Sequence, residues 1–305
     1  MDWITGIGRA VSYIEDNLAG EIDFAEAAAR SCSSPSHFAR VFSILSGYTL
    51  GEYVRLRRLT LAGAELARGE AKVIDTALKY GYDSPDSFAK AFRAFHGISP
   101  SEARRGGAKL KSFSRLSIKI TLEGGSIMNY RIEERKAFRL LGYRRRFTGS
   151  PAERMEQEKA FFCETRLNQF LLAGMAKDAD TQYGVMTNFG EDGYDFFIAG
   201  AVPEDLIDAH RSPEYVGEEL ADRLGLEPIR IPAGLWLVCE TERCRYPTLQ
   251  HIPLRQEAVT NRLPDSGYEL REGPEFMVAH WYADERYTER YVEVWLPIRK
   301  TDDKP

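Results

Sequence analysis

Apolar residues recur at every third or fourth position through the first third of the chain, a spacing typical of amphipathic helices. The run at 35–46, for example, places Phe38, Val41, Phe42 and Leu45 on one face. Later in the chain the pattern changes to short runs that alternate apolar with polar residues or are rich in aromatic and β-branched residues, which predicts strands. We therefore expect a helical part followed by a part built around a sheet.

One segment of the helical part occurs twice, at a constant offset of 50 residues. SSPSHFARVFSILSG at 33–47 corresponds to DSPDSFAKAFRAFHG at 83–97. Each copy has a Ser that can cap a helix, a Pro at the first helical position and a Gly that can end the helix in a left-handed conformation. Shorter apolar helices are expected before each copy, at 22–31 and 73–81. This arrangement predicts a tandem pair of helix-turn-helix motifs.

A single long helix is expected between the two copies. Its pattern begins at a capping box formed by Thr49 and Glu52 and ends at Gly69. Such a helix would hold two DNA-reading helices at a fixed separation. A separation of about 34 Å would place both of them in successive major grooves on one side of the duplex.

The faces opposite the apolar stripes carry small polar residues and long cations, which suits a helix that enters a major groove about 12 Å wide. The candidate DNA-contacting residues are Ser36, His37, Arg40 and Ser43 in the first copy and Asp86, Ser87, Lys90 and Arg93 in the second. An isolated cation on a helix is more often only a solvated charge. The equivalent positions of Arg40 and Lys90 favour DNA contact, whereas for Ser36 and Asp86 the two interpretations have equal weight.

Residues 1–106 resemble the DNA-binding domain of AraC/XylS-type transcription regulators, and YGYDSPDSFAKAFRAFHGISPSEAR is similar to that family's signature. The resemblance implies that Ser36 and Arg40 contact bases from the first copy, as Asp86 and Lys90 do from the second. Positions that relatives often fill with Trp or Gln hold Ser36 and Ala39 here. The partners that the resemblance implies are double-stranded DNA and RNA polymerase.

The remaining two-thirds of the chain predicts an α+β fold, with one curved antiparallel sheet and helices on one face. Helical patterns are present at 153–176, 213–225 and 250–262. The predicted strands are LSIKITLEGG (116–125), NYRIEERKAFRLLGYRRRF (129–147), YGVMTNFG (183–190), YDFFIAGAV (194–202), GLWLVCETE (234–242), EFMVAHWY (275–282) and YVEVWLPI (291–298).

Many aromatic residues lie on these strands, together with one carboxylate of interest. Glu293 and Trp295 point to the same side because strand side chains alternate. A carboxylate among aromatic rings suits a flat cation, which ring faces attract. The alternative, that the rings are ordinary core and Glu293 is a charge at the sheet edge, has about equal weight. The candidate ligand-binding residues are Tyr183, Phe197, Trp236, Trp281, Glu293 and Trp295.

Residues 113–300 resemble the GyrI-like effector-binding domain, through the segments YGVMTNF, FFIAGAV, IPAGLWLVCE, LPDSGYELREGPEFMVAHW and EVWLPIRK. The resemblance implies a duplicated βαββ fold with a cleft between its halves, an acidic ligand contact at Glu293, and walls that include Tyr183 and Trp295. The segment 203–228 is longer than is usual for the family and could cover the cleft.

The resemblance also leaves the activity of this domain open. Some GyrI-like domains resemble hydrolases of strained-ring compounds, in which case Glu293 with Tyr183 would activate water. A protein-interaction module is a further alternative. We expect a sensor of a small aromatic or cationic effector rather than an enzyme, without a cofactor or a metal.

Charge divides the chain in the same place as the pattern does. Up to Lys111 there are 15 Lys and Arg against 13 Asp and Glu, and the remainder has 26 against 33, which sums to the net charge of −5. We expect two domains, residues 1–107 for DNA binding and 108–305 for the effector, with a hinge at Gly106 and Gly107. The four cysteines are scattered, which favours neither disulfides nor a zinc site. With no signal peptide or membrane span in the pattern, a cytoplasmic location is expected.

Overall fold

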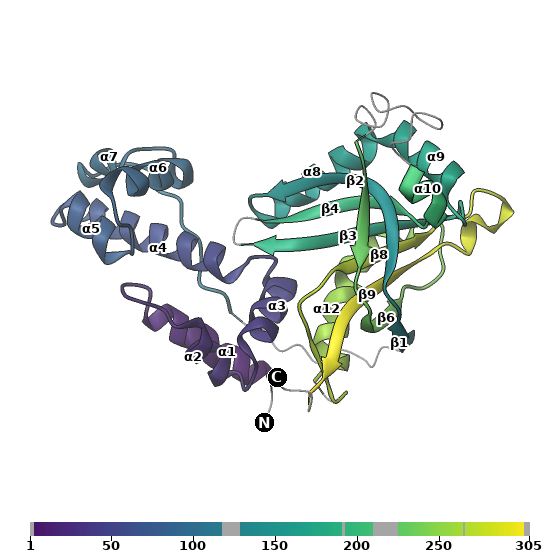
Figure 1. Ribbon diagram of the computed structural model, residues 1–305. Coiled ribbons are helices and arrows are strands. Elements are labelled where there is room, and N and C mark those ends of the chain that lie inside the picture. The colour runs from purple at the N-terminus through teal and green to yellow at the C-terminus, as the bar shows by residue number, and fades with distance from the viewer. Residues whose placement is uncertain (1–2, 118–128, 191–192, 210–224, 265, 302–305) are drawn as a thin grey trace. The chain divides into compact units, whose positions relative to one another are not determined.

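The computed structural model describes residues 3–117, 129–190, 193–209, 225–264 and 266–301 (Figure 1). Contacts between Cα atoms divide the chain into two compact units, Met1–Leu122 and Glu123–Pro305, which are described separately below. The domain boundary expected at residue 107 stays a prediction. Within the described ranges, every helix is too short or too polar to cross a membrane.

Among the described residues of the first unit, all regular elements are helices, as the apolar spacing predicted. Its helices are α1 (Trp3–Asp16), α2 (Phe24–Arg30), α3 (Pro35–Ser46), α4 (Leu50–Ala67), α5 (Val73–Lys79), α6 (Pro85–His96) and α7 (Pro100–Arg104). Helix α4 contacts α3 of the first motif, α5 and α6 of the second motif, and α7 (Figure 1). It is therefore the shared element that joins the two helix-turn-helix motifs.

The predicted helix ends are confirmed. The hydroxyls of Ser34 and Ser84 cap α3 and α6 by accepting hydrogen bonds from the backbone N–H groups of His37 and Ser87. Gly47 and Gly97 end these helices in the left-handed conformation, with φ of 78° and 81°. The capping box of Thr49 and Glu52 begins α4. Local sequence therefore determines where each of these helices starts and where α3 and α6 end.

The buried faces of the two long motif helices differ in detail from the prediction. Phe38, Val41 and Phe42 are buried in α3, but Leu45 is only partly buried, and Ile44 is buried instead. In α6 the buried stripe extends to a histidine, His96, because its ring packs against Phe92 at 4.2 Å between centroids. The His96 ring nitrogen Nε2 lies 3.0 Å from the Leu59 carbonyl oxygen of α4. A polar side chain thus belongs to this core because its ring nitrogens have partners there.

The turns of the two motifs have different lengths. In the second motif Gly81 has φ of 77°, a conformation that favours glycine. In the first motif the left-handed residue is Cys32, with φ of 56°, and the turn is one residue shorter. Gly81 also lies close to α4, because a Cβ atom there would be 2.5 Å from Nη1 of Arg58. The first motif therefore has a strained turn that contains no glycine.

The segment after α7 returns along α4. The backbone N–H of Phe113 donates to the Thr60 hydroxyl at 2.9 Å, and that of Lys111 donates to His96 Nδ1 at 3.2 Å. The Phe113 ring packs edge-on against Tyr48, with 5.0 Å between centroids. The backbone N–H of Leu116 donates to the Tyr53 hydroxyl at 3.2 Å. Residues well beyond the expected hinge therefore contact the helical unit.

The second unit is an α+β fold with one antiparallel sheet, as predicted. Its strands are β1 (Asn129–Arg135), β2 (Phe138–Thr148), β3 (Thr181–Gly190), β4 (Gly193–Gly200), β5 (Leu226–Ile231), β6 (Gly234–Glu240), β7 (Tyr268–Leu270), β8 (Glu275–His280) and β9 (Tyr291–Lys300). Its helices are α8 (Pro151–Glu164), α9 (Arg166–Met175), α10 (Glu204–Ala209) and α12 (His251–Glu257), with short turns η1 (Pro247–Gln250), η2 (Ala258–Arg262) and η3 (Glu285–Thr288).

The sheet consists of two similar halves. Its strand order is β1-β6-β9-β8-β3-β4-β2-β5, with β7 beside β9. In the first half β2 is followed by α8 and α9 and then by the β3–β4 hairpin, and in the second half β6 is followed by α12 and the β8–β9 hairpin. The halves meet where β3 pairs with β8 (Figure 1). The duplicated βαββ arrangement is confirmed.

Two predictions on strands and helices need comment. The run at 129–147 is two strands rather than one, because residues 136 and 137 leave the extended pairing, and β1 and β2 pair with different partners. The helix predicted at 213–225, most of the strand predicted at 116–125 and the central part of the segment 203–228 lie outside the described residues.

The two faces of the sheet have separate cores. The face covered by helices packs Phe147 and Phe196 against Phe161 of α8. The opposite face buries a second cluster that contains Trp236, Phe276 and Trp295. Successive residues of a strand point to opposite faces of the sheet, and here they belong in turn to the two clusters. The sheet is therefore apolar on both faces. The second cluster forms the floor of the pocket described below.

Candidate DNA-binding surface and ligand pocket

The candidate DNA-contacting residues lie on α3 and α6, on the sides of these helices that face away from the buried Phe pairs. Asp86, Ser87, Lys90 and Arg93 are exposed on α6. Their counterparts on α3, which are Ser36, His37, Arg40 and Ser43, are partly buried. Both sets belong to the same helical unit, which presents them from opposite ends of α4. Direct contact of these residues with DNA stays a prediction.

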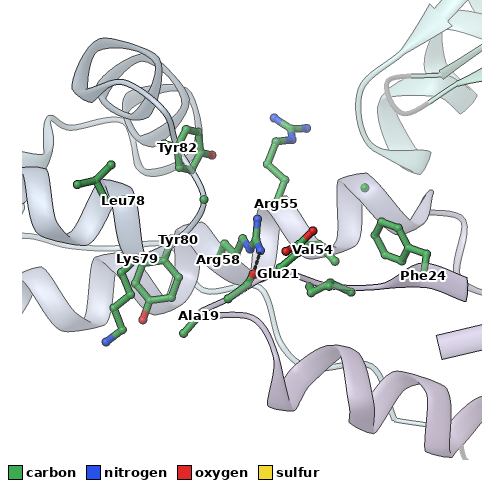
Figure 2. Close-up of a pocket in the computed structure, with 14 residues that line it drawn as sticks. Ala19, Glu21, Phe24, Val54, Arg55, Arg58, Leu78, Lys79, Tyr80 and Tyr82 are labelled. Atoms are coloured by element: carbon green, nitrogen blue, oxygen red, sulfur yellow. Dashed lines mark hydrogen bonds between the residues drawn. The ribbon is translucent and has the colours of Figure 1, made fainter. Parts of the chain in front are cut away.

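A cleft lies between the two motifs, within the helical unit. It has a volume of about 690 Å3 and is lined by the loop after α1, by one side of α4 and by the end of α5 with its turn (Figure 2). Arg58 lies at its centre and connects these elements: its Nε donates to the Leu18 carbonyl at 2.9 Å and its Nη2 to the Gly20 carbonyl at 2.5 Å. Burial lowers the pKa of this guanidinium. Arg55 and Lys79 add two further cations to the lining.

From the sequence, Arg58 and Lys79 of this cleft are plausible contacts to DNA phosphates rather than to bases. Lys79 forms an ion pair with Glu65 at 2.7 Å, so its charge is partly neutralised. Arg58 instead fixes the loop that precedes α2 to the helix that both motifs share. The two hydrogen bonds of Arg58 therefore fix the loop before α2 to α4 along one wall of the cleft.

The pocket of the second unit lies across the junction of the two halves of the sheet. Its volume is about 260 Å3, and β1, β3, β8 and β9 each contribute to it. The lining residues are Arg131, Arg135, Asp178, Thr181, Tyr183, Ala201, Val278, His280, Glu293 and Trp295. Tyr183 and Trp295 meet edge to face with 6.1 Å between ring centroids. The pocket is thus a small concavity with an aromatic floor and a polar rim.

Glu293 is buried at the centre of this pocket, with a relative exposure of 5%. Its Oε1 accepts a hydrogen bond from Arg131 Nη2 at 2.7 Å, and its Oε2 accepts one from Trp295 Nε1 at 2.7 Å. Burial alone would raise the pKa of this carboxyl, but the His280 ring, the Arg131 guanidinium and the Trp295 N–H favour the charged form and lower its pKa to about 2. The site therefore holds a carboxylate that is ionised at neutral pH.

Two arginines of β1 extend into the pocket from the edge of the sheet. Arg131 forms ion pairs with Glu133, Glu240 and Glu293. The Arg135 guanidinium lies over the Trp295 ring, 3.9 Å from its centroid, and its Nε donates to Glu133 at 2.8 Å. Trp295 and Glu293, two of the predicted ligand contacts, are therefore already in contact with Arg135 and Arg131 of the chain itself.

The structure brings together three of the six predicted ligand-binding residues, namely Tyr183, Glu293 and Trp295. Phe197 and Trp236 are buried in the cluster beneath the pocket and do not line it. Trp281 lies just beyond β8, where the Arg290 guanidinium covers its ring at 4.2 Å from the centroid. Whether these residues bind a ligand stays a prediction.

Sequence reasoning missed the arginines, although a signal was present. Arg131, Glu133 and Arg135 alternate along one strand, so they lie on one face of β1. A single strand predicted over 129–147 does not reveal that β1 ends at Arg135 and pairs with β6, which in turn pairs with β9. His280 and Thr181 could not be found in this way, because they reach the pocket only through the pairing of β3 with β8.

Comparison with known proteins supports both units. Residues 27–106 match the family model described as a helix-turn-helix domain, and residues 128–299 match the GyrI-like small molecule binding domain. The HTH-type transcriptional activator AarP of Providencia stuartii is 44% identical over 95 residues, which are 31% of this chain and 70% of AarP. Regulatory protein SoxS of Salmonella typhimurium is 33% identical over 98 residues, which are 32% of this chain and 92% of SoxS.

A solved structure resembles the second unit. The structure of SAV2435 bound to tetraphenylphosphonium is 14% identical, with a TM-score of 0.41, and the match covers 56% of this chain and 94% of that chain. In class, the protein is a transcription regulator that combines a helix-turn-helix DNA-binding domain with a small-molecule binding domain. The chain belongs to the AraC-type family of transcription regulators, and its larger part belongs to the GyrI-like family.

Proposed function

We propose that this regulator reads a specific DNA site through α3 and α6, and that a small aromatic or cationic molecule in the Glu293 pocket modulates its activity. The observation that carries the ligand part is the buried, ionised carboxylate of Glu293 beside the rings of Trp295 and Tyr183. A desolvated negative charge next to ring faces attracts a flat cation more strongly than a neutral molecule of the same shape.

The DNA part of the proposal rests on the duplication. Arg40 and Lys90 occupy equivalent positions in the two motifs. Arg and Lys side chains on a helix in the major groove typically contact guanine. Helix α4 has 18 residues, which at 1.5 Å per residue gives about 27 Å of rigid connection. This length is compatible with two helices in successive major grooves, so one chain could occupy both.

A ligand can change transcription only if it binds two states of the protein with different affinity. The states proposed here differ in the arrangement of the domains or in contact with RNA polymerase. This proposal keeps the hinge at Gly106 and Gly107, and a movement there must also release the contacts of residues 111–116 with the helical unit. Both glycines have positive φ, 81° and 77°, and a Cβ atom at either would meet open space.

The ligand part is tested with a matched pair of probes. Glu293→Gln removes the charge but keeps the size, and Arg131 keeps Glu133 and Glu240 as partners. We expect this variant to lose about 10-fold or more in affinity for the flat cation 1-methylquinolinium and little for neutral quinoline, measured by isothermal titration calorimetry. Glu269→Gln is the control, because Glu269 pairs with Arg299 at 2.7 Å outside the pocket.

An unchanged cation affinity in Glu293→Gln would remove the carboxylate from the binding site. Hydrolysis, the second candidate activity, is less favoured by the same geometry. A general base works best with a pKa near the operating pH, whereas the pKa of Glu293 is about 2 and both of its oxygens accept hydrogen bonds. A strained-ring compound that is recovered intact after incubation with the protein supports a sensor, whereas product formation that disappears in Glu293→Gln supports an enzyme.

A further inference from the structure

The position of Arg135 bears on which ligands the pocket accepts, given the proposed function. Its guanidinium lies 3.9 Å from the centroid of the Trp295 ring, which also lines the pocket. This is the place where the charge of a flat cation would stack on the same ring. An arginine side chain is itself a flat cation that stacks on aromatic faces. Arg135 thus occupies the position that the proposed ligand requires.

Neighbouring charges hold Arg135 in this position. Glu133 accepts from Arg135 Nε at 2.8 Å and from Arg131 Nε at 2.5 Å, so one carboxylate orients both arginines. Arg131 in turn is anchored on Glu293 at 2.7 Å. Because the three residues alternate on the edge strand β1, the strand itself directs them toward the pocket. The arrangement is built into the sheet and does not depend on a flexible loop.

The space available in the pocket also favours displacement of Arg135 by a ligand. The pocket measures about 260 Å3, whereas pockets for drug-sized ligands usually measure about 300–1,000 Å3. A ligand that stacks on the Trp295 ring needs Arg135 to move, because the guanidinium already covers that ring. Arg135 is suited to this, because its side chain is 34% exposed and can move into solvent, whereas Trp295 is buried and anchored on Glu293.

We propose that Arg135 is a built-in competitor for the ligand site, which a flat aromatic cation must displace from Trp295 in order to bind. The pocket then rejects small or weakly stacking cations, because these cannot replace the contacts of Arg135 with Trp295 and Glu133. It accepts cations with a larger ring surface, which regain on Trp295 and Tyr183 what the displaced guanidinium loses. Arg135 is accordingly a specificity-determining residue of the pocket.

The test measures binding of 1-methylquinolinium and quinoline to the full-length chain by isothermal titration calorimetry. Arg135→Gln vacates the ring face, so the affinity for 1-methylquinolinium should rise about 3- to 30-fold. The affinity for quinoline should rise as well, by a smaller factor, because the neutral ring also gains access to Trp295. Arg135→Lys keeps the charge but lacks the flat guanidinium, so its affinity for the cation should lie between those of the wild type and Arg135→Gln.

Arg290→Gln is the matched control. Arg290 also covers a tryptophan, Trp281, at 4.2 Å, but neither residue lines the pocket. This variant should bind both probes as the wild type does.

The outcomes separate this inference from the proposed function. If Arg135→Gln binds the cation no better than the wild type while Glu293→Gln binds it worse, the competitor role is wrong and the proposed ligand site stands. If Arg135→Lys matches the wild type and quinoline binding does not change in Arg135→Gln, Arg135 acts only through its charge, which also overturns the inference. If neither the wild type nor Arg135→Gln binds either probe, the proposed ligand site and this inference fail together.

Discussion

At the scale of single residues, Cys32 departs most clearly from what the sequence favours. It adopts a left-handed conformation that is unfavourable for a residue with a Cβ atom by roughly 1–2 kcal/mol. A glycine at this position would remove the strain of the folded state. It would also raise the conformational entropy of the unfolded chain, which cancels part of the gain in stability. We expect Cys32→Gly to raise the free energy of unfolding of the helical unit by up to about 1 kcal/mol, as measured by urea denaturation.

Cys32→Ala is the control for this prediction, since alanine keeps the Cβ atom and removes only the thiol. It should leave the stability nearly unchanged. Equal stabilisation by Ala and Gly would show that the thiol, and not the backbone conformation, is responsible.

Glu158 of α8 provides a prediction about pH. Burial raises the pKa of its carboxyl from 4.5 to about 7. In the folded state this group keeps its proton to a higher pH than in the unfolded state, so its contribution to stability is full below about pH 4.5 and is lost as the pH rises to about 7. Glu158→Gln should therefore stabilise the second unit above pH 7, by on the order of 2 kcal/mol, and have little effect at pH 4.

The measurement is the free energy of unfolding of the second unit at pH 4, 6 and 8. Glu156→Gln serves as the control, because Glu156 lies on the same helix, is exposed and pairs with Lys159 at the surface. A stabilisation by Glu158→Gln that is the same at all three pH values would contradict the raised pKa.

Some of the site residues could be read from sequence because their position depends on local geometry alone. Strand alternation places Glu293 and Trp295 on one side, and the structure has the Trp295 N–H bonded to the Glu293 carboxylate. Phe197 and Trp236 were chosen for the same aromatic character but lie in the core. An aromatic residue on a strand that is buried on both faces has no pattern that separates a pocket wall from a core position.

At the scale of elements, the segment after α7 shows how a linker composition can mislead. ARRGGAKLKS breaks the helical pattern and is basic, yet the residues that follow it pack on α4 through Phe113, Tyr48 and Tyr53. Phe113→Ala should lower the free energy of unfolding of the helical unit by about 1–2 kcal/mol, because the ring is partly buried and its full burial would be worth more. The exposed Leu78 gives the control variant Leu78→Ala, for which we expect a change within about 0.5 kcal/mol.

If Phe113→Ala has the same free energy of unfolding as the wild type, the segment after α7 does not stabilise the helical unit. The prediction is measured by thermal or urea unfolding of the full-length chain, followed by a probe of helix content.

The sequence predicted the presence of helices and strands more reliably than it predicted where they are divided and how they pack. Caps and apolar spacing gave the five helices α2 to α6 with ends close to those observed. In the second unit the helix expected at 153–176 is divided at Thr165 into α8 and α9, and the strands β5 and β7 were not predicted. These details depend on packing between distant segments, which periodicity does not contain.

At the scale of the whole molecule, a mildly basic DNA-binding part is joined to an acidic small-molecule binding part. A DNA-binding part with so small a net charge must depend on the placement of a few cations. We therefore expect its affinity for a specific site to be less salt-dependent than that of a strongly basic protein. The duplication makes such a design workable. If both motifs contact bases, two motifs on one helix would double the number of base contacts without requiring a second chain.

Whether α3 and α6 together read one DNA site is tested most directly by hydroxyl-radical footprinting of the full-length chain on the tightest-binding fragment selected from the host chromosome. We expect two protected tracts on the same side of the duplex, about 10 base pairs apart, with Arg40→Ala removing protection in one tract and Lys90→Ala in the other. A single protected tract that both variants weaken equally, or no protection at low salt, would contradict it.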